Sequence, residues 1–212
     1  MAQRNYGNER TERSRNPRGE GHRLREELVE AASELLARGT SEEALSLRAV
    51  AREVGIAPTS IYLHFRDKEE ILWAVSEARF RELGQHMDEM AAQASSPAEE
   101  LRARAMAYCR YGLDHPHHYR VLFGSEPIEK AKRSLSELPG GWVFEGLRDS
   151  FARALAAGEA ARTEDPFLST VLLWATLHGL VTLRASKPQF PWPPIEQLVD
   201  AALETYIGVT RA

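Results

Sequence analysis

The sequence predicts an all-α protein in which a short three-helix head precedes a longer antiparallel helical body. Apolar residues recur at helical spacing through most of the 212 residues, and no segment shows convincing period-two alternation. Residues that typically begin or end helices flank these periodic segments, at spacings that suit helices. The apolar share of 43% and the charged share of 27% are ordinary for a soluble globular chain.

Residues 1–20 are expected to form a disordered arm, because they mix Arg, Asn, Gly and Glu with almost no apolar content. Such an arm is able to enter a DNA minor groove, but interspersed glutamates favour an idle tail. Its arginines are Arg4, Arg10, Arg13, Arg15 and Arg18. The arm lacks the apolar stretch of a secretory signal, and no apolar run approaches the roughly 20 residues that cross a bilayer. A cytoplasmic protein without a membrane partner is expected.

Residues 21–70 are expected to fold as the head. Its first helix follows a stripe from Leu24 to Leu35, with Gly39 as a stop. The second, in "SLRAVAREVG", is capped by Ser46 and ended by Gly55. A third short helix lies in "APTSIYLHF", and "DKEEILWAV" opens a longer one whose first residues resemble a capping box. The tight glycine turn between the second and third helices predicts a helix-turn-helix.

Residues 71–212 are expected to form the body. Its helices are predicted at about 68–93, from Pro97 to "DHPHH", and at about 142–158, 166–186 and 195–210. Segment 125–141 lacks clean periodicity, which predicts a loop or a weak helix.

The third short helix has two unlike faces when it is turned by about 100° per residue. Ile61 and Phe65 fall on one face, while Thr59 and Leu63 fall opposite with Tyr62 beside them. A helix that only packs does not need a tyrosine and a threonine facing water. Hydroxyls suit phosphate oxygens, and small or apolar side chains suit base edges and thymine methyls. The face predicts contact with DNA in a major groove.

The stretch "SLRAVAREVGIAPTSIYLHFRDKEEIL" resembles the DNA-binding domain of TetR-type one-component transcriptional regulators. The resemblance covers about residues 22–72, and the pattern that carries it is Ser60, Tyr62, His64, Phe65, Lys68 and Glu69. The resemblance implies a double-stranded DNA operator as partner and the following contact residues: Ser46, Arg48, Ala57, Pro58, Thr59, Ser60, Tyr62, Leu63, His64 and Lys68.

Within that set, the resemblance assigns phosphates to Tyr62, His64 and Lys68, and the other edge of the groove to Ser46 and Arg48. The stretch from Ala57 to Thr59 is assigned to the bases; a proline at position 58 shifts base readout toward shape and methyl contacts. Alternatives from the residues alone are a half-buried aromatic at Tyr62, a local supporting role for His64, and a solvated surface charge at Arg48.

A homodimer is expected, because dimeric readers place two recognition helices roughly 34–36 Å apart on successive major grooves. The last two helices are the expected interface: "FLSTVLLWATLHGLVTL" is apolar almost all round, and "IEQLVDAALETYIGV" adds a second stripe. Trp174, His178 and Gly179 resemble the C-terminal domain of a TetR subgroup named for its Trp-His-Gly residues.

The resemblance also implies a small-molecule effector that binds among the central helices and prefers the state that does not bind DNA. Candidate pocket residues are aromatic side chains with a few polar or sulfur-bearing neighbours. They are Met106, Tyr108, Cys109, Tyr111, Tyr119, Phe123, Trp142, Phe144, Phe151, Trp174 and His178. The alternative for each is ordinary helix core, and His178 could instead be an interface histidine beside Gly179.

The run "DHPHHY" offers a carboxylate and imidazoles to a metal. The alternative is a helix end, where histidines suit the negative end of the helix dipole, and the resemblance places a turn there that starts the next helix. No metal site, cofactor or enzymatic motif is expected. The predicted function is a dimeric regulator, a repressor that a small ligand releases from a palindromic operator. The alternatives are a ligand-independent or activating DNA-binding regulator and a metal sensor.

Overall fold

The computed structural model describes residues 21–124, 134–160 and 165–209, and in these ranges every regular element is a helix. The all-α prediction is confirmed. The α-helices are α1 (Gly21–Ala37), α2 (Leu47–Val54), α3 (Lys68–Ala91), α4 (Pro97–Asp114), α5 (Pro116–Gly124), α6 (Gly141–Ala156), α7 (Pro166–Ser186) and α8 (Ile195–Ile207). Two short 3₁₀ helices, η1 (Ser60–Leu63) and η2 (Leu135–Glu137), complete the set. The N-terminal arm and most of the weakly periodic segment 125–141 lie outside the described residues.

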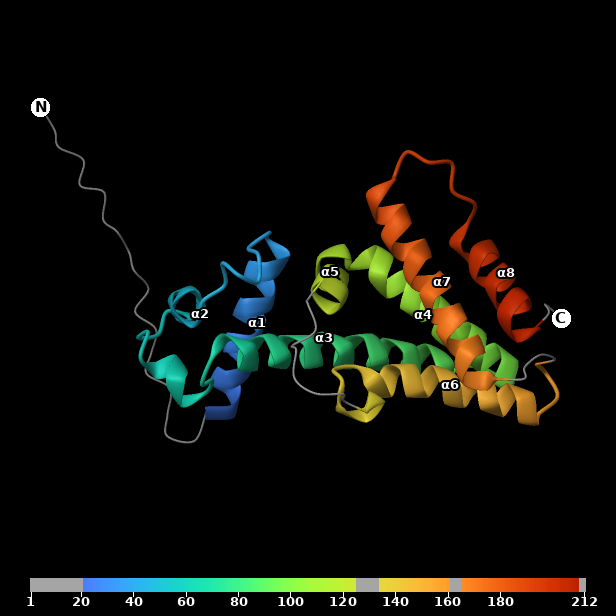
Figure 1. The fold of residues 1–212 in the computed structure, drawn as a ribbon, viewed down its shortest axis with the longest axis horizontal. Helices are drawn as coiled ribbons and strands as arrows, with labels where there is room; N and C mark the ends of the chain where they lie inside the picture. Colours follow the sequence, from blue (N-terminus) through green and yellow to red (C-terminus); the bar gives the residue numbers. More distant parts are fainter. Residues whose placement is uncertain (1–20, 125–133, 161–164, 210–212) are drawn as a thin grey trace, which may run out of the picture.

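Helix α3 runs from the head into the body (Figure 1) and contributes residues to the core of each. Ile71 and Val75, in its first turns, are buried with α1 and α2 in the head core. Leu83 and Met87, farther along, are buried in the body core with α4, α6, α7 and α8. A rigid helix shared by two cores can transmit a movement of one to the other.

Helix α5 is the second link between head and body. Val121 is buried in the head core, and Arg120 donates to the carbonyl of Ala37 at the end of α1, at 2.9 Å. Tyr119 and Leu122 of the same helix belong to the body core. Opposite faces of one short helix therefore contact the two parts of the protein.

Local capping chemistry fixes most helix limits. The Oγ atoms of Ser46 and Ser96 accept from the third following backbone N–H, and Pro97 and Pro166 begin α4 and α7. The capping box expected at the start of α3 forms with a different backbone N–H, one residue earlier in the chain. Asp67 caps α3, but the carboxylate of Glu70 accepts from the backbone N–H of Arg66 rather than from that of Asp67.

The third short helix is a single 3₁₀ turn rather than an α-helix. The backbone N–H of Ser60 donates to the carbonyl of Ala57, and that of His64 donates to the carbonyl of Ile61, both with i to i+3 spacing. Gly55, at φ +78°, ends α2 in the left-handed conformation that favours glycine. The tight turn still buries Ile61 and Phe65, as their positions in the sequence indicate.

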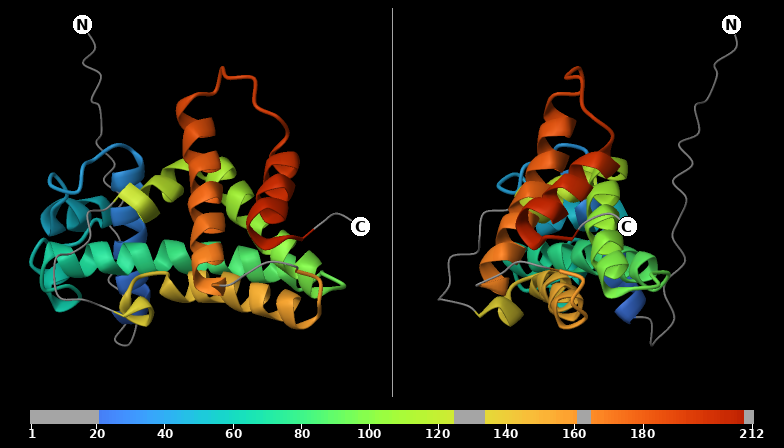
Figure 2. Two further views of the ribbon diagram at one scale, coloured as in Figure 1. Left: turned by 45° about the vertical axis from the view of Figure 1, so that its right-hand side comes forward. Right: turned by 90° about the vertical axis from the view of Figure 1, so that its right-hand side faces the viewer.

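Helices α7 and α8 pack side by side over α4 (Figure 2). Within the described part of the chain, α7 alone is long and apolar enough to cross a membrane by length and composition. Leu173, Leu177 and Val181 are nevertheless buried against the rest of the body. They make α7 a core helix with one remaining exposed face.

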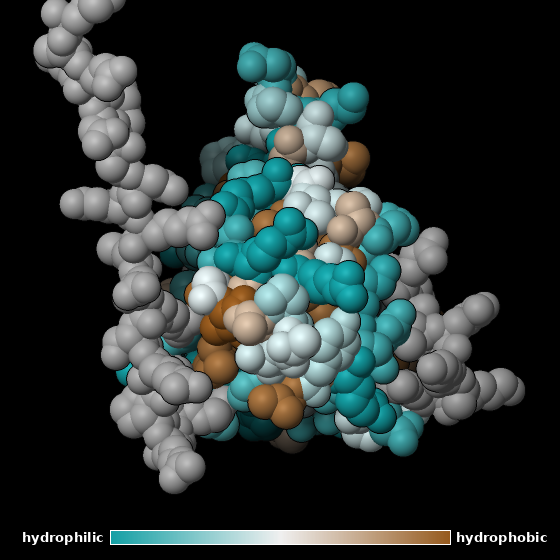
Figure 3. Space-filling view, turned by 90° about the vertical axis from the view of Figure 1, so that its left-hand side faces the viewer, coloured by the Kyte–Doolittle hydropathy of each residue, from teal (hydrophilic) through white to brown (hydrophobic). Residues whose placement is uncertain are grey.

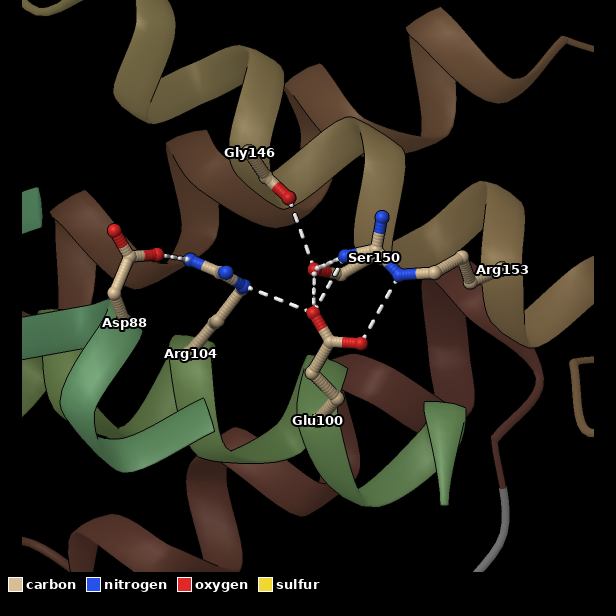
Figure 4. Close-up of polar contacts among 6 residues, drawn as sticks. All are labelled: Asp88, Glu100, Arg104, Gly146, Ser150 and Arg153. Atoms are coloured by element: carbon tan, nitrogen blue, oxygen red, sulfur yellow. Dashed lines mark hydrogen bonds and ion pairs between the residues drawn. The ribbon is translucent and has the colours of Figure 1, made fainter. Parts of the chain in front are cut away.

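A partly buried network of ion pairs and hydrogen bonds around Glu100 connects α4 to α6 and α3 (Figure 4). The carboxylate of Glu100 accepts from Arg153 at 2.5 and 3.0 Å, from the Ser150 hydroxyl at 2.8 Å and from Arg104 at 3.3 Å. Arg104 also donates to Asp88 at 2.6 Å. Hydrogen bonds from Arg153, with smaller contributions from Ser150 and Arg104, lower the pKa of Glu100 to about 2.

Candidate functional site

The η1 turn presents two neighbouring side chains to solvent at the tip of the head. Tyr62 is 51% exposed and Leu63 is 85% exposed, whereas Ile61 and Phe65 are 0% and 1% exposed. Side by side, Tyr62 and Leu63 form a small apolar surface that is exposed to solvent. Figure 3 looks onto this end of the molecule, where small hydrophobic patches interrupt a largely hydrophilic surface.

All ten predicted DNA contacts lie at the surface of the head. Exposed members are Ser46, Arg48, Ala57, Pro58, Thr59, Tyr62 and Leu63; Ser60, His64 and Lys68 are partly exposed. They come from the start of α2, the turn after it, η1 and the start of α3. A cation–π contact attaches the segment after η1 to α1: the guanidinium of Arg25 lies 4.6 Å from the ring centroid of Phe65.

Lys68 has a contact that the sequence did not indicate. Its ammonium group donates to the carbonyl oxygen of Glu42, in the loop between α1 and α2, at 3.2 Å. An ammonium group has three donors, so two remain for a phosphate.

A cavity of about 500 Å³ opens between α3, α6 and α7, a size within the roughly 300–1,000 Å³ range of small-molecule sites. Its wall is aromatic and aliphatic, with few polar side chains. Helix α3 contributes Leu72, Trp73, Ser76, Phe80, Leu83 and Met87; the other helices contribute Tyr108, Leu122, Phe123, Val143, Phe144, Leu147, Phe167, Val171 and Trp174. Glu42, from the head, completes one end.

Four of the predicted pocket residues line this cavity: Tyr108, Phe123, Phe144 and Trp174. Met106, Cys109, Tyr111 and Phe151 are buried in the body core away from the wall. Trp142 lies on the outer side of α6, where its indole packs so closely on Gly84 that a Cβ there would lie 2.1 Å from the ring. Burial raises the pKa of the Cys109 thiol to about 12, which keeps it protonated.

Tyr119 and His178 lie behind the wall and reach it through hydrogen bonds. The Tyr119 hydroxyl is 2.8 Å from His178 Nδ1 and 2.8 Å from the Tyr108 hydroxyl. Trp174 Nε1 donates to the Tyr108 hydroxyl at 3.1 Å. Burial raises the pKa of both tyrosines and lowers that of His178, so all three side chains are neutral near pH 7.

A glycine turn between η2 and α6 closes one side of the cavity. Gly140 has φ +71°, and a Cβ at this position would lie 2.2 Å from the ring of Phe80. A Cβ at the next residue, Gly141, would lie 1.8 Å from the carbonyl oxygen of Leu135. Backbone without side chains is required here for the turn to rest on the aromatic wall.

The histidines of "DHPHHY" lie at the break between α4 and α5. His115 follows the last residue of α4 and stacks with His118, at 5.8 Å between ring centroids. His118 faces Arg79 and Glu82 of α3, and desolvation together with the Arg79 charge lowers its pKa. Arg79 also pairs with Glu30 of α1. Among the described residues, no three His, Cys, Asp or Glu side chains are placed to hold a metal ion.

Two family matches cover most of the chain. Residues 28–75 match bacterial regulatory proteins of the tetR family, and residues 101–206 match a tetracyclin repressor-like C-terminal domain. The first match contains η1 and the start of α3, and the second contains the α4, α5 and α7 walls of the cavity.

Solved structures share the fold. A protein of unknown function from Rhodococcus sp. RHA1 has a TM-score of 0.73 at 27% identity, over 89% of this chain and 96% of that one. SmeT, the repressor of the Stenotrophomonas maltophilia multidrug efflux pump SmeDEF, has a TM-score of 0.64 at 19% identity, over 86% and 90%.

FadR from Bacillus subtilis, solved in complex with stearoyl-CoA, has a TM-score of 0.66 at 18% identity, over 88% of this chain and 99% of that one. At these identities SmeT and FadR show the likeness of fold, while the family matches cover both the head and the body. The chain belongs to the TetR family of DNA-binding transcriptional regulators and is not an enzyme.

Proposed function

We propose that this protein is a homodimeric repressor that a small, largely apolar molecule releases from a palindromic operator. The observation that carries the proposal is the position of the cavity. Its wall includes Glu42 of the head together with the α3 side chains that continue into the body core. A ligand in that space contacts both parts of the protein at once, so it can favour one arrangement of the head over another.

The exposed η1 turn supports DNA as the partner of the head. Tyr62 is exposed and the flanking Ser60 and His64 are partly exposed, so their side chains are available as donors to phosphates; the exposed Thr59 and Leu63 are chemically suited to base edges. Regulation of DNA also implies a cytoplasmic location. Two related proteins support a ligand-responsive repressor: SmeT is the repressor of a multidrug efflux pump, and FadR was solved in complex with stearoyl-CoA.

The exposed face of α7 supports the homodimer. Leu168, Leu172 and Leu183 are exposed on one stripe of this helix, and Gly179 lies between them. A Cβ at Gly179 would meet nothing within 4 Å inside the protein. A glycine weakens a helix interior by about 1 kcal/mol relative to alanine, and close approach of a second copy of the chain would account for a glycine at this position.

The same Trp174, His178 and Gly179 support membership of the Trp-His-Gly subgroup.

Selection of genomic DNA fragments tests the proposal. Wild type and Tyr62→Ala are each mixed with sheared genomic DNA, and bound fragments are sequenced. We expect wild type alone to enrich fragments that contain a palindrome. Equal enrichment by the variant would show that η1 is not the reading surface. An operator that stays bound in the presence of every small molecule tested would instead favour the ligand-independent regulator.

A further inference from the structure

A chain of hydrogen bonds crosses the back wall of the cavity. It runs from Trp174 of α7 through Tyr108 of α4 and Tyr119 of α5 to His178 of α7, with spacings of 3.1, 2.8 and 2.8 Å. A longer contact of 3.5 Å also joins the Tyr108 hydroxyl to His178 Nδ1 directly. Tyr108 and Trp174 line the cavity, whereas Tyr119 and His178 do not. The chain, called the relay below, therefore has one end at the ligand space and one end behind it.

The direction of the relay follows from counting donors. An indole N–H only donates, a tyrosine hydroxyl has one hydrogen, and a neutral imidazole nitrogen either donates or accepts. In the first arrangement Trp174 donates to Tyr108, Tyr108 donates to Tyr119, and Tyr119 donates to His178 Nδ1. Every hydroxyl hydrogen is then used. This arrangement suits an empty cavity, because a buried hydroxyl hydrogen without an acceptor is unfavourable.

The second arrangement reverses two of the hydrogen bonds. The other neutral tautomer of His178 donates from Nδ1 to Tyr119, and Tyr119 donates to Tyr108. The Tyr108 oxygen then accepts from both Tyr119 and Trp174, and its own hydrogen has no acceptor in the relay. That hydrogen is free to bond a ligand that carries an acceptor.

The charge of the cavity wall also restricts the ligand. Among the described residues, no lysine, arginine or histidine side chain lines the cavity, and the carboxyl group there is that of Glu42. An anion would lose its hydration without gaining a cationic partner, which is strongly unfavourable in an apolar site. Apart from Glu42, the lining side chains that carry a polar atom are Trp73, Ser76, Tyr108 and Trp174, and of these Tyr108 and Trp174 belong to the relay.

Resting on the proposed function, we infer that the effector is an uncharged, largely apolar molecule whose hydrogen-bond acceptor docks on the Tyr108 hydroxyl. Its binding reverses the relay, and His178 is the positioning residue that supplies or accepts the hydrogen at the far end. The relay thus selects a ketone, amide, ether or similar acceptor within an apolar body, and the apolar wall, with Glu42 and no cationic side chain, disfavours carboxylates and phosphates.

Three matched probes separate shape from hydrogen bonding and charge. Benzophenone carries a carbonyl acceptor, 1,1-diphenylethylene replaces that carbonyl oxygen with a methylene group, and 4-benzoylbenzoate adds a carboxylate. Their dissociation constants for the full chain are measured by quenching of tryptophan fluorescence, since Trp73 and Trp174 line the cavity. We expect benzophenone to bind wild type about fivefold more tightly than 1,1-diphenylethylene, as one net hydrogen bond predicts, and 4-benzoylbenzoate to bind most weakly.

Variants then test the relay. Tyr108→Phe removes the docking hydroxyl, and the ratio between the two neutral probes should fall to about one. Tyr111→Phe, a buried tyrosine that bonds Glu82 outside the cavity, should keep the wild-type ratio. His178→Phe removes the acceptor that holds the relay in its empty-cavity direction. The Tyr108 hydrogen is then free before any ligand binds, so this ratio should rise above that of wild type. His178→Gln, whose amide offers either a donor or an acceptor, should restore the wild-type ratio of the two dissociation constants.

The outcomes distinguish the relay from the cavity. Equal binding of benzophenone and 1,1-diphenylethylene to wild type would overturn the inference and leave the cavity as a ligand site. A ratio in His178→Phe no higher than that of wild type would overturn the relay, because a purely structural role for His178 weakens both probes alike. Tight binding of 4-benzoylbenzoate would overturn the charge assignment. Binding of none of the three would overturn the proposed ligand response together with the inference.

Discussion

The ammonium group of Lys68 donates a hydrogen bond to the carbonyl oxygen of Glu42, 3.2 Å away, and Glu42 lines the end of the ligand cavity. The lysine that the family resemblance assigns to a DNA phosphate is thus tied to the loop that a bound ligand would contact. Lys68 is also the first residue of α3, the helix that spans both cores. The proposed DNA-binding face and the cavity are therefore connected by this hydrogen bond, in addition to α3 itself.

Replacement of Lys68 by Met keeps most of the side-chain stem and removes the charge. We expect similar weakening of binding to operator and to random DNA, and a salt dependence of log K that is shallower by about 1, as loss of one phosphate contact predicts. Titrations at several salt concentrations measure both effects. Lys187→Met is the matched control, because it removes an exposed lysine at the far end of α7. Indistinguishable salt slopes for the two variants would exclude Lys68 as a phosphate contact.

Thr59 and Tyr62 should differ in the kind of binding that they lose. Tyr62→Phe removes a hydroxyl assigned to a phosphate, so affinity should fall by a similar factor for every sequence. Thr59→Ala removes a contact to a base edge, so preference at one operator position should relax by about 1–3 kcal/mol. Affinities for a set of operators with single base-pair changes distinguish the two patterns. A uniform loss in Thr59→Ala would move Thr59 from the bases to the backbone.

The helix limits were predictable because they depend on neighbouring residues. Ser46, Pro97 and Pro166 begin helices where the sequence indicated, and α7 has the predicted limits of 166–186. The partners of Glu70 and Glu99 were less predictable. Each carboxylate binds the backbone N–H of the residue before the cap, in Arg66 and Ser95. Spacing along the chain identifies a capping carboxylate, but the loop geometry decides which N–H it reaches.

The cavity was only partly predictable, because its main wall is α3. Trp73, Ser76, Phe80, Leu83 and Met87 recur at alternating intervals of three and four residues, which identifies one helix face. That pattern does not reveal whether the face is covered by packed side chains or by an open space. Candidate aromatic residues taken from the later helices include Tyr108 and Trp174 of the wall, and also core residues such as Phe151.

Gly140→Ala should destabilise the protein by more than strain at a positive φ alone explains. Gly140 and Gly158 both have φ +71°, but a Cβ at Gly158 would meet nothing within 4 Å, whereas one at Gly140 would strike Phe80. We expect a cost of about 1 kcal/mol for Gly158→Ala and a further 1–3 kcal/mol for Gly140→Ala. Chemical denaturation of both variants measures the difference. Equal costs would show that Phe80 moves aside without penalty.

Glu100 should stabilise the fold at neutral pH and lose this effect in acid. Its pKa is about 2 in the folded protein against an ordinary 4.5, so its contribution is complete above pH 4.5 and is lost as pH falls toward 2. Partial solvation reduces the contribution to about 1–2 kcal/mol. Free energies of unfolding for wild type and Glu100→Gln should differ most at pH 7, approach each other below pH 4.5 and converge only as the pH falls to about 2. Glu89→Gln, at an exposed site on α3, is the control; a difference for Glu100→Gln that persists in acid would contradict the assignment.

The exposed stripe of α7 should hold two copies of the chain together. Leu172→Glu places a charge on the stripe beside Leu168, and burial of an unpaired charge in an interface is strongly unfavourable. Gly179→Leu fills the open position between the leucines; because a Cβ at this position meets nothing within 4 Å inside one chain, we expect the monomer to remain folded.

Sedimentation equilibrium should therefore show a dimer for wild type and a monomer for both variants, with unchanged helix content. Operator affinity should fall when the dimer is lost, because each monomer reads only one half-site. Gln85→Glu, which adds the same charge at an exposed site on α3, should remain dimeric. A dimer that persists in both α7 variants would place the interface on another face of the body and leave the exposed leucines unexplained.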